Sequence, residues 1–218
     1  MKYPHPFWRL PFILLATMLL GGCQLQSPGE PAAPARDILF EDDFEDAASG
    51  WNRVAADSGE SDYADGMYRI LVNDSFLDIW ARPGLTYTDT VTEVDAIKVG
   101  GERNNRFGIV CRVVGPTNFY ALMISSDGFY GIGKIKGDQF TLIDQKAFQP
   151  NDAILQGSAI NHLRADCIGD TLTLYVNNQK IVEAMDSEYT HGDVGLIAGT
   201  YESPGVDLRF DHFIVTKP

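Results

Sequence analysis

Residues 161–178 read NHLRADCIGDTLTLYVNN, and this stretch decides the fold class of the chain. Up to Ile168 the apolar side chains occupy alternate positions, which is the pattern of a β-strand with one face in a core. Gly169-Asp170 then interrupts the alternation, and Asn177-Asn178 interrupts it again. Asn tolerates the positive φ angles of the tight turns that join antiparallel strands. The stretch therefore predicts two consecutive β-hairpins, with strands at 161–168, 171–176 and Lys180–Ala184.

The same alternation continues along the rest of the chain from residue 37, broken by turn residues at short intervals. No segment shows a sustained helical period with capping residues. Many short strands without helices between them predict an all-β fold, an antiparallel two-sheet sandwich, in one domain over residues 37–218. The other strands that we expect are Ile38–Phe44, Met67–Val72, Phe76–Arg82, Val91–Val99, Arg106–Val114, Phe119–Ser125, Tyr130–Lys136, Phe140–Lys146, Asp193–Gly199 and Val206–Thr216.

The composition excludes several classes of protein. The 218 residues contain 17 Lys and Arg against 30 Asp and Glu, a formal net charge of −13, and no basic cluster. A nucleic-acid-binding surface needs clustered positive charge, so nucleic acid is excluded as a partner, and so is a membrane surface bound by charge alone. Aromatic residues make up 11% of the chain, enough to build a core, which excludes disorder for most of the sequence.

The N-terminal segment has the composition of an export signal followed by a tether. Lys2 and Arg9 accompany an apolar run, Leu10–Leu20, that is shorter than the ~20 residues needed to span a membrane. The run ends in Leu-Gly-Gly-Cys23, which resembles the lipobox of bacterial lipoproteins. The resemblance implies a signal peptide at 1–22, lipid on Cys23 and a Pro-rich tether that ends at residue 36. We therefore expect an exported protein, anchored by lipid in the bacterial cell envelope, in the outer membrane if the host has two membranes. The alternative is an ordinary signal peptide with a chance Cys.

Two cysteines remain besides Cys23. Cys111 shares its strand phase with Ile109, and Cys167 shares its phase with Ala165, so both thiols point with apolar side chains toward the core. Oxidation is permitted in an exported protein, and an even number of cysteines is left after lipidation. We predict a disulfide between Cys111 and Cys167. Two separate buried thiols are the alternative, because free Cys packs like a small apolar residue.

Three segments carry a resemblance to a known superfamily. They are the opening Phe40–Asp46 with Gly50-Trp51, the segment Tyr63–Val72 and the closing Gly205–Val215. Together they resemble the concanavalin A-like lectin/glucanase superfamily, which includes family-16 glycoside hydrolases, laminin-G-like modules and bacterial domains named after 3-keto-disaccharide hydrolase. The resemblance implies a jelly roll of two curved sheets, often with ligands on the concave face. It does not by itself imply sugar hydrolysis.

One strand tests the enzyme hypothesis directly. Family-16 hydrolases carry a Glu-x-Asp-x-(x)-Glu strand, and retaining hydrolysis needs two carboxylates, one as nucleophile and one as acid/base. Glu93 and Asp95 match the first two acids, but Ile97 and Lys98 occupy the place of the second catalytic Glu. We therefore predict no family-16 activity and assign no catalytic residue. On the alternative reading of this strand, Glu93 and Asp95 are simply its polar phase.

A calcium site is a further expectation from the resemblance. Many sandwiches of the superfamily hold a structural Ca²⁺ through carbonyl and carboxylate oxygens, the ligands that hard cations prefer. In this sequence the matching positions are Asp43 or its neighbour, Gly66 and Asp211, although His212 replaces the aromatic residue usual after the last Asp. The alternative is that Asp43 and Asp211 only cap adjacent strand ends in water.

The polar phase of the central strands gives a candidate ligand face. Glu93, Asp95 and Arg112 fall in this phase, while Tyr120 and Tyr130 flank the hairpin at Asp127-Gly128. If their strands are neighbours, these five residues form a surface of carboxylates, Arg and Tyr that suits a sugar. The alternative is a salt-bridged outer face, with Tyr filling space between the sheets.

Three functions follow in order of preference. The first is a non-catalytic lectin-like module that binds a glycan. The second is an interaction module of laminin-G type, whose partner is an envelope or extracellular protein. The third is a glycoside-processing enzyme of the 3-keto-disaccharide hydrolase type. In each case the membrane is engaged only through the lipid anchor, and possible structural calcium is the one cofactor expected.

Overall fold

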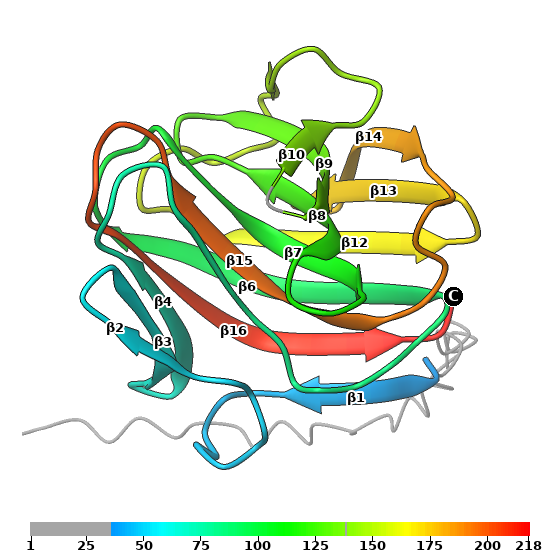
Figure 1. Ribbon diagram of the computed structural model, residues 1–218, viewed down its shortest axis with the longest axis horizontal. Helices are drawn as coiled ribbons and strands as arrows, with labels where there is room; N and C mark the ends of the chain where they lie inside the picture. The colour runs from blue at the N-terminus through cyan, green and yellow to red at the C-terminus, as the bar shows by residue number, and fades with distance from the viewer. Residues whose placement is uncertain (1–35, 138) are drawn as a thin grey trace, which may run out of the picture. The chain divides into compact units, whose positions relative to one another are not determined.

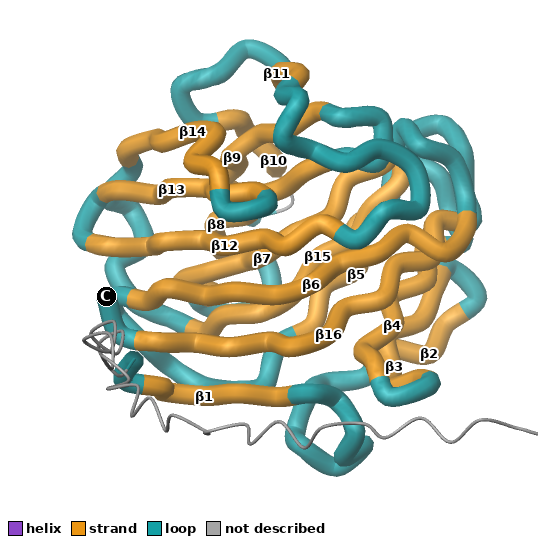
Figure 2. Tube along the Cα trace, turned by 180° about the vertical axis from the view of Figure 1, so that it is seen from behind, coloured by secondary structure: helices purple, strands orange, loops and turns teal. Residues whose placement is uncertain are grey.

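Two antiparallel β-sheets, packed face to face, make up the computed structural model, which describes residues 36–137 and 139–218 (Figures 1 and 2). The predicted all-β sandwich is confirmed. Within the described residues, no helix is long and apolar enough to cross a membrane. The predicted signal peptide, Cys23 and almost all of the tether lie outside the described residues.

The larger sheet has nine strands in the order β14-β13-β12-β6-β16-β4-β3-β2, with β1 paired to β16. Its central strands, β6 and β16, are 11 residues long each. The bounds are β1 Ile38–Asp42, β2 Val54–Ala56, β3 Gly59–Ala64, β4 Met67–Val72, β6 Thr90–Gly100, β12 Asn161–Ile168, β13 Thr171–Val176, β14 Gln179–Met185 and β16 Val206–Thr216.

The smaller sheet has seven strands in the order β10-β9-β8-β7-β15-β5, with β11 paired to β9. Its strands are β5 Asp78–Ala81, β7 Asn105–Val113, β8 Asn118–Ile124, β9 Phe129–Lys136, β10 Gln139–Leu142, β11 Gln149–Pro150 and β15 Asp193–Thr200. In Figure 1 this sheet contains β7, β8 and β15, in front of β6, β12 and β16.

Strands with clear alternation lie where the sequence predicts them. The hairpin turn between β13 and β14 has Asn177 at φ 49° and Asn178 at φ 65°, the left-handed conformation that two Asn residues tolerate. The sequence misses β2, β3 and β11. Of these, β3 reads GESDYA, and it lacks an apolar alternation because it lies near the end of the sheet, next to β2.

The inner faces of the two sheets share one core. Large, fully buried side chains come from both, such as Ile109 and Leu122 on one side and Ile70 and Phe210 on the other. The predicted disulfide is confirmed: Cys111 on β7 is bonded to Cys167 on β12, which links the two sheets covalently through the core.

Candidate functional site

The outer face of the nine-stranded sheet is covered with paired charges. Glu93 lies on this face, and both of its carboxylate oxygens accept hydrogen bonds of 2.9 Å from Arg36. Asp95 Oδ1 lies 2.8 Å from Nδ1 of His162, and its other oxygen lies 3.5 Å from Nδ1 of His212. Glu93 and Asp95 therefore belong to the polar phase of β6, as the alternative reading of that strand expects.

The five predicted ligand residues do not come together. Glu93 and Asp95 lie on β6 of the nine-stranded sheet, whereas Arg112, Tyr120 and Tyr130 lie on β7, β8 and β9 of the other sheet. Strands β7, β8 and β9 are neighbours, but β6 is not next to any of them, so the predicted joint surface is wrong. Tyr120 is fully buried, and Tyr130 is partly buried against the core rather than facing outward.

The predicted outward position of Arg112 is also wrong, because the alternation of inward and outward side chains along β7 fails at this residue. Its φ is +53°, and the pairing of β7 with β15 shifts register nearby, which is the geometry of a β-bulge. The side chain is only 3% exposed, and Nη1 donates a 2.9 Å hydrogen bond to the carbonyl of Tyr189. Nη2 lies 3.2 Å from Asp89. Arg112 thus ties loops together and is not available on the outer surface.

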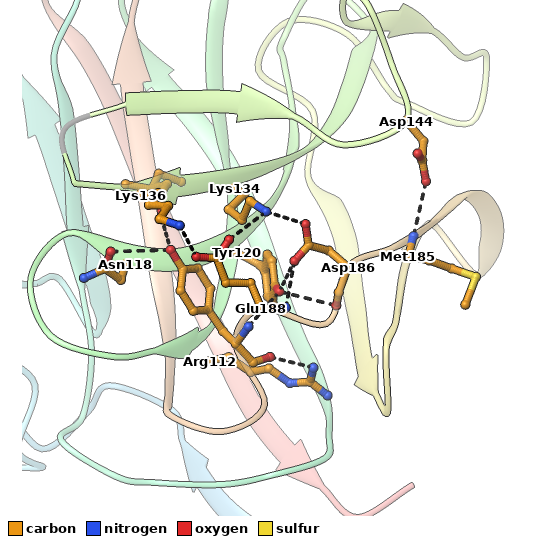
Figure 3. A network of polar contacts seen from close by, with 11 residues as sticks. Arg112, Asn118, Tyr120, Lys134, Lys136, Asp144, Met185, Asp186 and Glu188 are labelled. Atoms are coloured by element: carbon orange, nitrogen blue, oxygen red, sulfur yellow. Dashed lines mark hydrogen bonds and ion pairs between the residues drawn. The ribbon is translucent and has the colours of Figure 1, made fainter.

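Tyr120 belongs to a polar network that fastens the β14–β15 connection to β8 and β9 (Figure 3). Its hydroxyl donates a 2.6 Å hydrogen bond to Asp186, which also accepts a bond from Lys134. Burial raises the pKa of Tyr120 to about 12. Burial also acts to raise the pKa of Asp186, but the bonds from Lys134 and Tyr120 outweigh it and hold that pKa below its ordinary value. The hydrogen-bonding groups of Tyr120, Lys134 and Asp186 bind one another, so we interpret the network as one that stabilises the fold.

The residues of the expected calcium site lie at the edge of the nine-stranded sheet, around β1, β16 and the turn before β4. The Asp43 carboxylate accepts a bond from the backbone N–H of Glu45, and the Asp211 carboxylate accepts one from that of His212. Gly66 occupies a turn at φ 71° beside the Glu45 carboxylate. Among the described residues, no group of three or more His, Cys, Asp and Glu is placed to hold a metal ion. Calcium binding stays a prediction, which melting temperatures with and without EDTA test.

The outer face of the seven-stranded sheet is apolar. Val110, Phe119, Ala121, Met123 and Ile197 face away from the main core, yet all are buried in a second hydrophobic cluster. Trp80, Ile135 and Phe148 pack against its margin and are partly exposed. At Gly133 the ring of Phe140 lies over the strand, so that an added Cβ would come within 2.1 Å of it. Aromatic rings therefore lie across this face and close part of it.

A cavity of about 180 Å³ lies at one end of this apolar face. Its polar lining comes from the start of β7 and from the turn after β8. Its aromatic rings come from the start of β9, from the residue before β11 and from the residue after β15. The lining residues are Asn104, Asn105, Ser125, Asp127, Phe129, Phe148 and Tyr201. We call this cavity, with these seven residues, the β7–β8 end site.

Buried hydrogen bonds hold the polar side of the β7–β8 end site. The Asn105 side chain is buried, donates to Ser126 Oγ at 3.1 Å and accepts from the Ser126 N–H at 3.0 Å. Ser125 donates its hydroxyl to the carboxylate of Asp127. The Asn105 side chain at the start of β7 therefore binds both the backbone and the side chain of the hairpin turn at Ser126. These bonds fix the cavity wall before any ligand enters.

The aromatic side of the site is held by an ion pair. The Arg106 guanidinium stacks 4.6 Å from the ring centre of Tyr201, and its Nε lies 2.6 Å from the Asp78 carboxylate. The carbonyl of Tyr201 accepts a 2.8 Å bond from the N–H of Phe76. Phe76 has a φ of 57°, which is a costly conformation for a residue other than glycine. The residue is exposed to solvent, at 69%.

The sequence gives only an indirect signal for this site. Both phases of β8 are apolar, which indicates a strand covered on both faces, and the Asp127-Gly128 hairpin places a carboxylate at its end. Nothing local joins Tyr201 or Phe148 to that hairpin. A larger cavity, of about 440 Å³, lies between β1 and β16 and is lined by Glu41, Asp42, Asp43, His212, Phe213 and Ile214. Phe213, its one Phe, Tyr or Trp among the described lining residues, is buried.

No family model matches the chain, and no curated protein matches it. Solved structures resemble it at low sequence identity. The carbohydrate-binding module CBM66 from Bacillus subtilis has 16% identity and a TM-score of 0.55, over 77% of this chain and 96% of that one. A Bacillus subtilis protein of unknown function with a galectin-like fold has 11% identity and a TM-score of 0.59, over 83% and 96%.

An endo-β-galactosidase from Clostridium perfringens that releases GlcNAcα1-4Gal is also similar. It has 12% identity and a TM-score of 0.58, over 88% of this chain and 65% of that one. At such identities the likeness concerns the fold, since unrelated functions share a fold of this kind. The chain therefore has the concanavalin A-like jelly-roll fold that its sequence resembles.

Proposed function

We propose that this domain binds carbohydrate without cleaving it, at the β7–β8 end site. The observation that carries the proposal is a preformed cavity in which aromatic rings and fixed polar groups converge. The rings of Tyr201 and Phe148 can stack on the C–H faces of a sugar. The carboxylate of Asp127 can accept bonds from sugar hydroxyls, and the exposed Asn104 amide can donate and accept.

The structural neighbours support this class of ligand. One of them is named as a carbohydrate-binding module, and another is an endo-β-galactosidase. Both have the same sandwich, which shows that this fold accommodates glycan recognition. The assignment to this chain rests on its own cavity.

The distribution of carboxylates supports binding over hydrolysis. Glycoside hydrolysis uses two carboxyl groups that flank the scissile bond, about 5–9 Å apart. Among the described lining residues of the β7–β8 end site, Asp127 is the one carboxylate. Glu93 and Asp95, the pair that resembles a family-16 strand, lie on the other sheet and are engaged by Arg36 and His162.

We also propose that the domain is displayed on the envelope, with its tether joined to the domain at the end of β6 opposite this site. Arg36, the last residue of the tether, binds Glu93 near the start of β6, where β1 also begins beside the end of β16. Asn104 and Asn105 follow the other end of β6. An 11-residue strand spans roughly 35 Å at ~3.3 Å per residue, so the described chain begins at the end of β6 remote from the cavity.

A glycan array with the purified protein tests the proposal. We expect binding to at least one oligosaccharide, and we expect Tyr201→Ala to weaken it by about tenfold or more, because the stacked ring is a central contact. Tyr175→Ala is the matched control, since Tyr175 lies under Arg164 at 4.8 Å but on the other sheet.

A hydrolysis screen with the same oligosaccharides runs in parallel. Turnover would overturn the non-catalytic part of the proposal, and it would point to the glycoside-processing alternative. Equal losses for Tyr201→Ala and Tyr175→Ala would overturn the location. A protein-interaction module would bind no glycan in the array.

A further inference from the structure

We infer that the β7–β8 end site selects neutral or amine-bearing sugars and rejects anionic ones, with Asp127 as the specificity-determining residue. This inference rests on the proposed function and adds a ligand class to it. Its basis is the balance of charges in and around the cavity, whose described lining holds a carboxylate and no cation.

Asp127 carries the one formal charge among the described lining residues of the cavity. Its carboxylate accepts the Ser125 hydroxyl, which fixes its orientation. Within residues 36–137 and 139–218, no Lys, Arg or His forms an ion pair with it. The carboxylate therefore keeps its negative charge toward the cavity and keeps lone pairs available for hydroxyl donors.

Arg106 does not compensate this charge. Its side chain is 14% exposed, its Nε is bonded to Asp78, and its face is covered by Tyr201. The Asp78 carboxylate offsets the charge of this guanidinium, and Arg106 is not among the residues that line the cavity. Arg106 therefore holds the Tyr201 ring from outside the cavity lining.

One exposed cation lies near the site. The guanidinium of Arg103 approaches Gly157, where an added Cβ would lie 3.6 Å from Nη2. Arg103 is flanked in sequence by Glu102, which is also exposed. Arg103 and Glu102 carry opposite charges and are exposed to solvent, which screens them. The carboxylate of Asp127 lines the cavity itself, so we expect it to set the sign of the electrostatic potential there.

Two chemical consequences follow for the ligand. A carboxylate has two oxygens that can accept bonds from two adjacent hydroxyls of one sugar ring, which favours a neutral sugar with a vicinal diol stacked on Tyr201. An ammonium group on the sugar would add attraction, whereas a sulfate or carboxylate placed near Asp127 would meet a like charge in a partly desolvated space.

The test uses paired probes on the full chain, measured by titration calorimetry at low salt. The pairs are lactose with sialyllactose, xylo-oligosaccharides with their glucuronic-acid-bearing forms, and chito-oligosaccharides with their deacetylated, amine-bearing forms. If lactose or a xylo-oligosaccharide binds, we expect its anionic partner to bind at least about tenfold more weakly. If a chito-oligosaccharide binds, we expect its amine-bearing form to bind at least equally well.

Asp127→Asn sharpens the test, because it removes the charge and keeps the shape. We expect this variant to lose most of the discrimination against the anionic probe, and to keep its melting temperature. Asp170→Asn is the matched control, since it removes the same charge at the exposed β12–β13 turn. We expect it to leave the discrimination unchanged.

The outcomes separate the two proposals. Binding of an anionic probe as tightly as its neutral parent would overturn this inference and leave carbohydrate binding intact. If Arg103→Gln abolished that binding, Arg103 would be the anion receptor. Absence of binding to every probe and to a glycan array would overturn the proposed function and this inference with it.

Discussion

The outer faces of the two sheets use opposite chemistry. On the nine-stranded sheet, Arg69 is bonded to Asp207 and Glu60, and Arg164 is bonded to Asp166, so the charges compensate one another in place. On the seven-stranded sheet the corresponding face is an apolar cluster. Each face has a Tyr under an Arg, Tyr175 on the first and Tyr201 on the second. Tyr201 lines the cavity of the β7–β8 end site, and this locates the candidate site.

The comparison teaches that a face rich in charged residues need not be the functional one. Charges that are already paired have little left to offer a ligand, whereas a cavity with a carboxylate free of any described cation has unused bonding capacity. The following predictions test the two faces and the link between them.

The largest effect should come from removing the covalent link between the sheets. The disulfide closes a loop with a sequence separation of 56, and the chain-entropy model gives it ~4 kcal/mol of stability. The double variant Cys111→Ala with Cys167→Ala should lower the free energy of unfolding by that amount in urea titrations. A loss below about 1 kcal/mol would show that the two sheets are held by packing alone.

The apolar outer face should be nearly as sensitive as the main core. Phe119 is 2% exposed and packs 5.4 Å from the ring centre of Trp80. Phe119→Ala should destabilise the protein by about 3 kcal/mol, because it leaves a cavity in a closed cluster. Tyr175→Ala on the charged face should cost less than half as much. Equal costs would contradict the contrast between the faces, and thermal unfolding of both variants measures them.

Alkaline pH should destabilise both sheets through one Tyr from each. Burial raises the pKa of Tyr68 on β4 and of Tyr120 on β8 from 10.0 to about 12. A raised folded-state pKa means that the stabilisation is complete below pH ~10 and is lost as the pH rises toward 12, by about 2 kcal/mol for each residue at pH 12.

Ultraviolet titration of tyrosinate measures this directly. Tyr68 and Tyr120 should be among the groups that ionise late, and Tyr120→Phe should remove one late step. Ionisation of every Tyr near pH 10 in the folded protein would contradict the prediction.

The smallest effect is expected on the charged face. Arg164 is 36% exposed in its side chain, and its pair with Asp166 lies partly in solvent. Arg164→Gln should therefore change the free energy of unfolding by less than about 1 kcal/mol, and less at high salt. Melting temperatures at low and high salt check this. A large, salt-independent loss would mean that this face is as closed as the other one.

Much of the fold could be predicted from the sequence, because alternation is a local property. The bounds of β4, β12, β13 and β16 agree with the predicted strands. The inward phases of Cys111 and Cys167, taken with the even cysteine count left after the expected lipidation and the expected export, favoured their bond over two separate thiols. The candidate site could not be predicted in the same way. It draws on residues from 104 to 201, and no local pattern states which strand ends meet.

Errors in the predicted ligand face have two physical causes. Partners were inferred across strands that belong to different sheets, and Arg112 lies in a bulge that alternation cannot reveal. The sequence by itself determined the fold class, the hairpins, the inward phase of the two cysteines and the net negative charge. The tertiary structure alone decided which polar residues neutralise each other and which remain free beside a cavity, because pairing depends on distances between segments far apart in the chain.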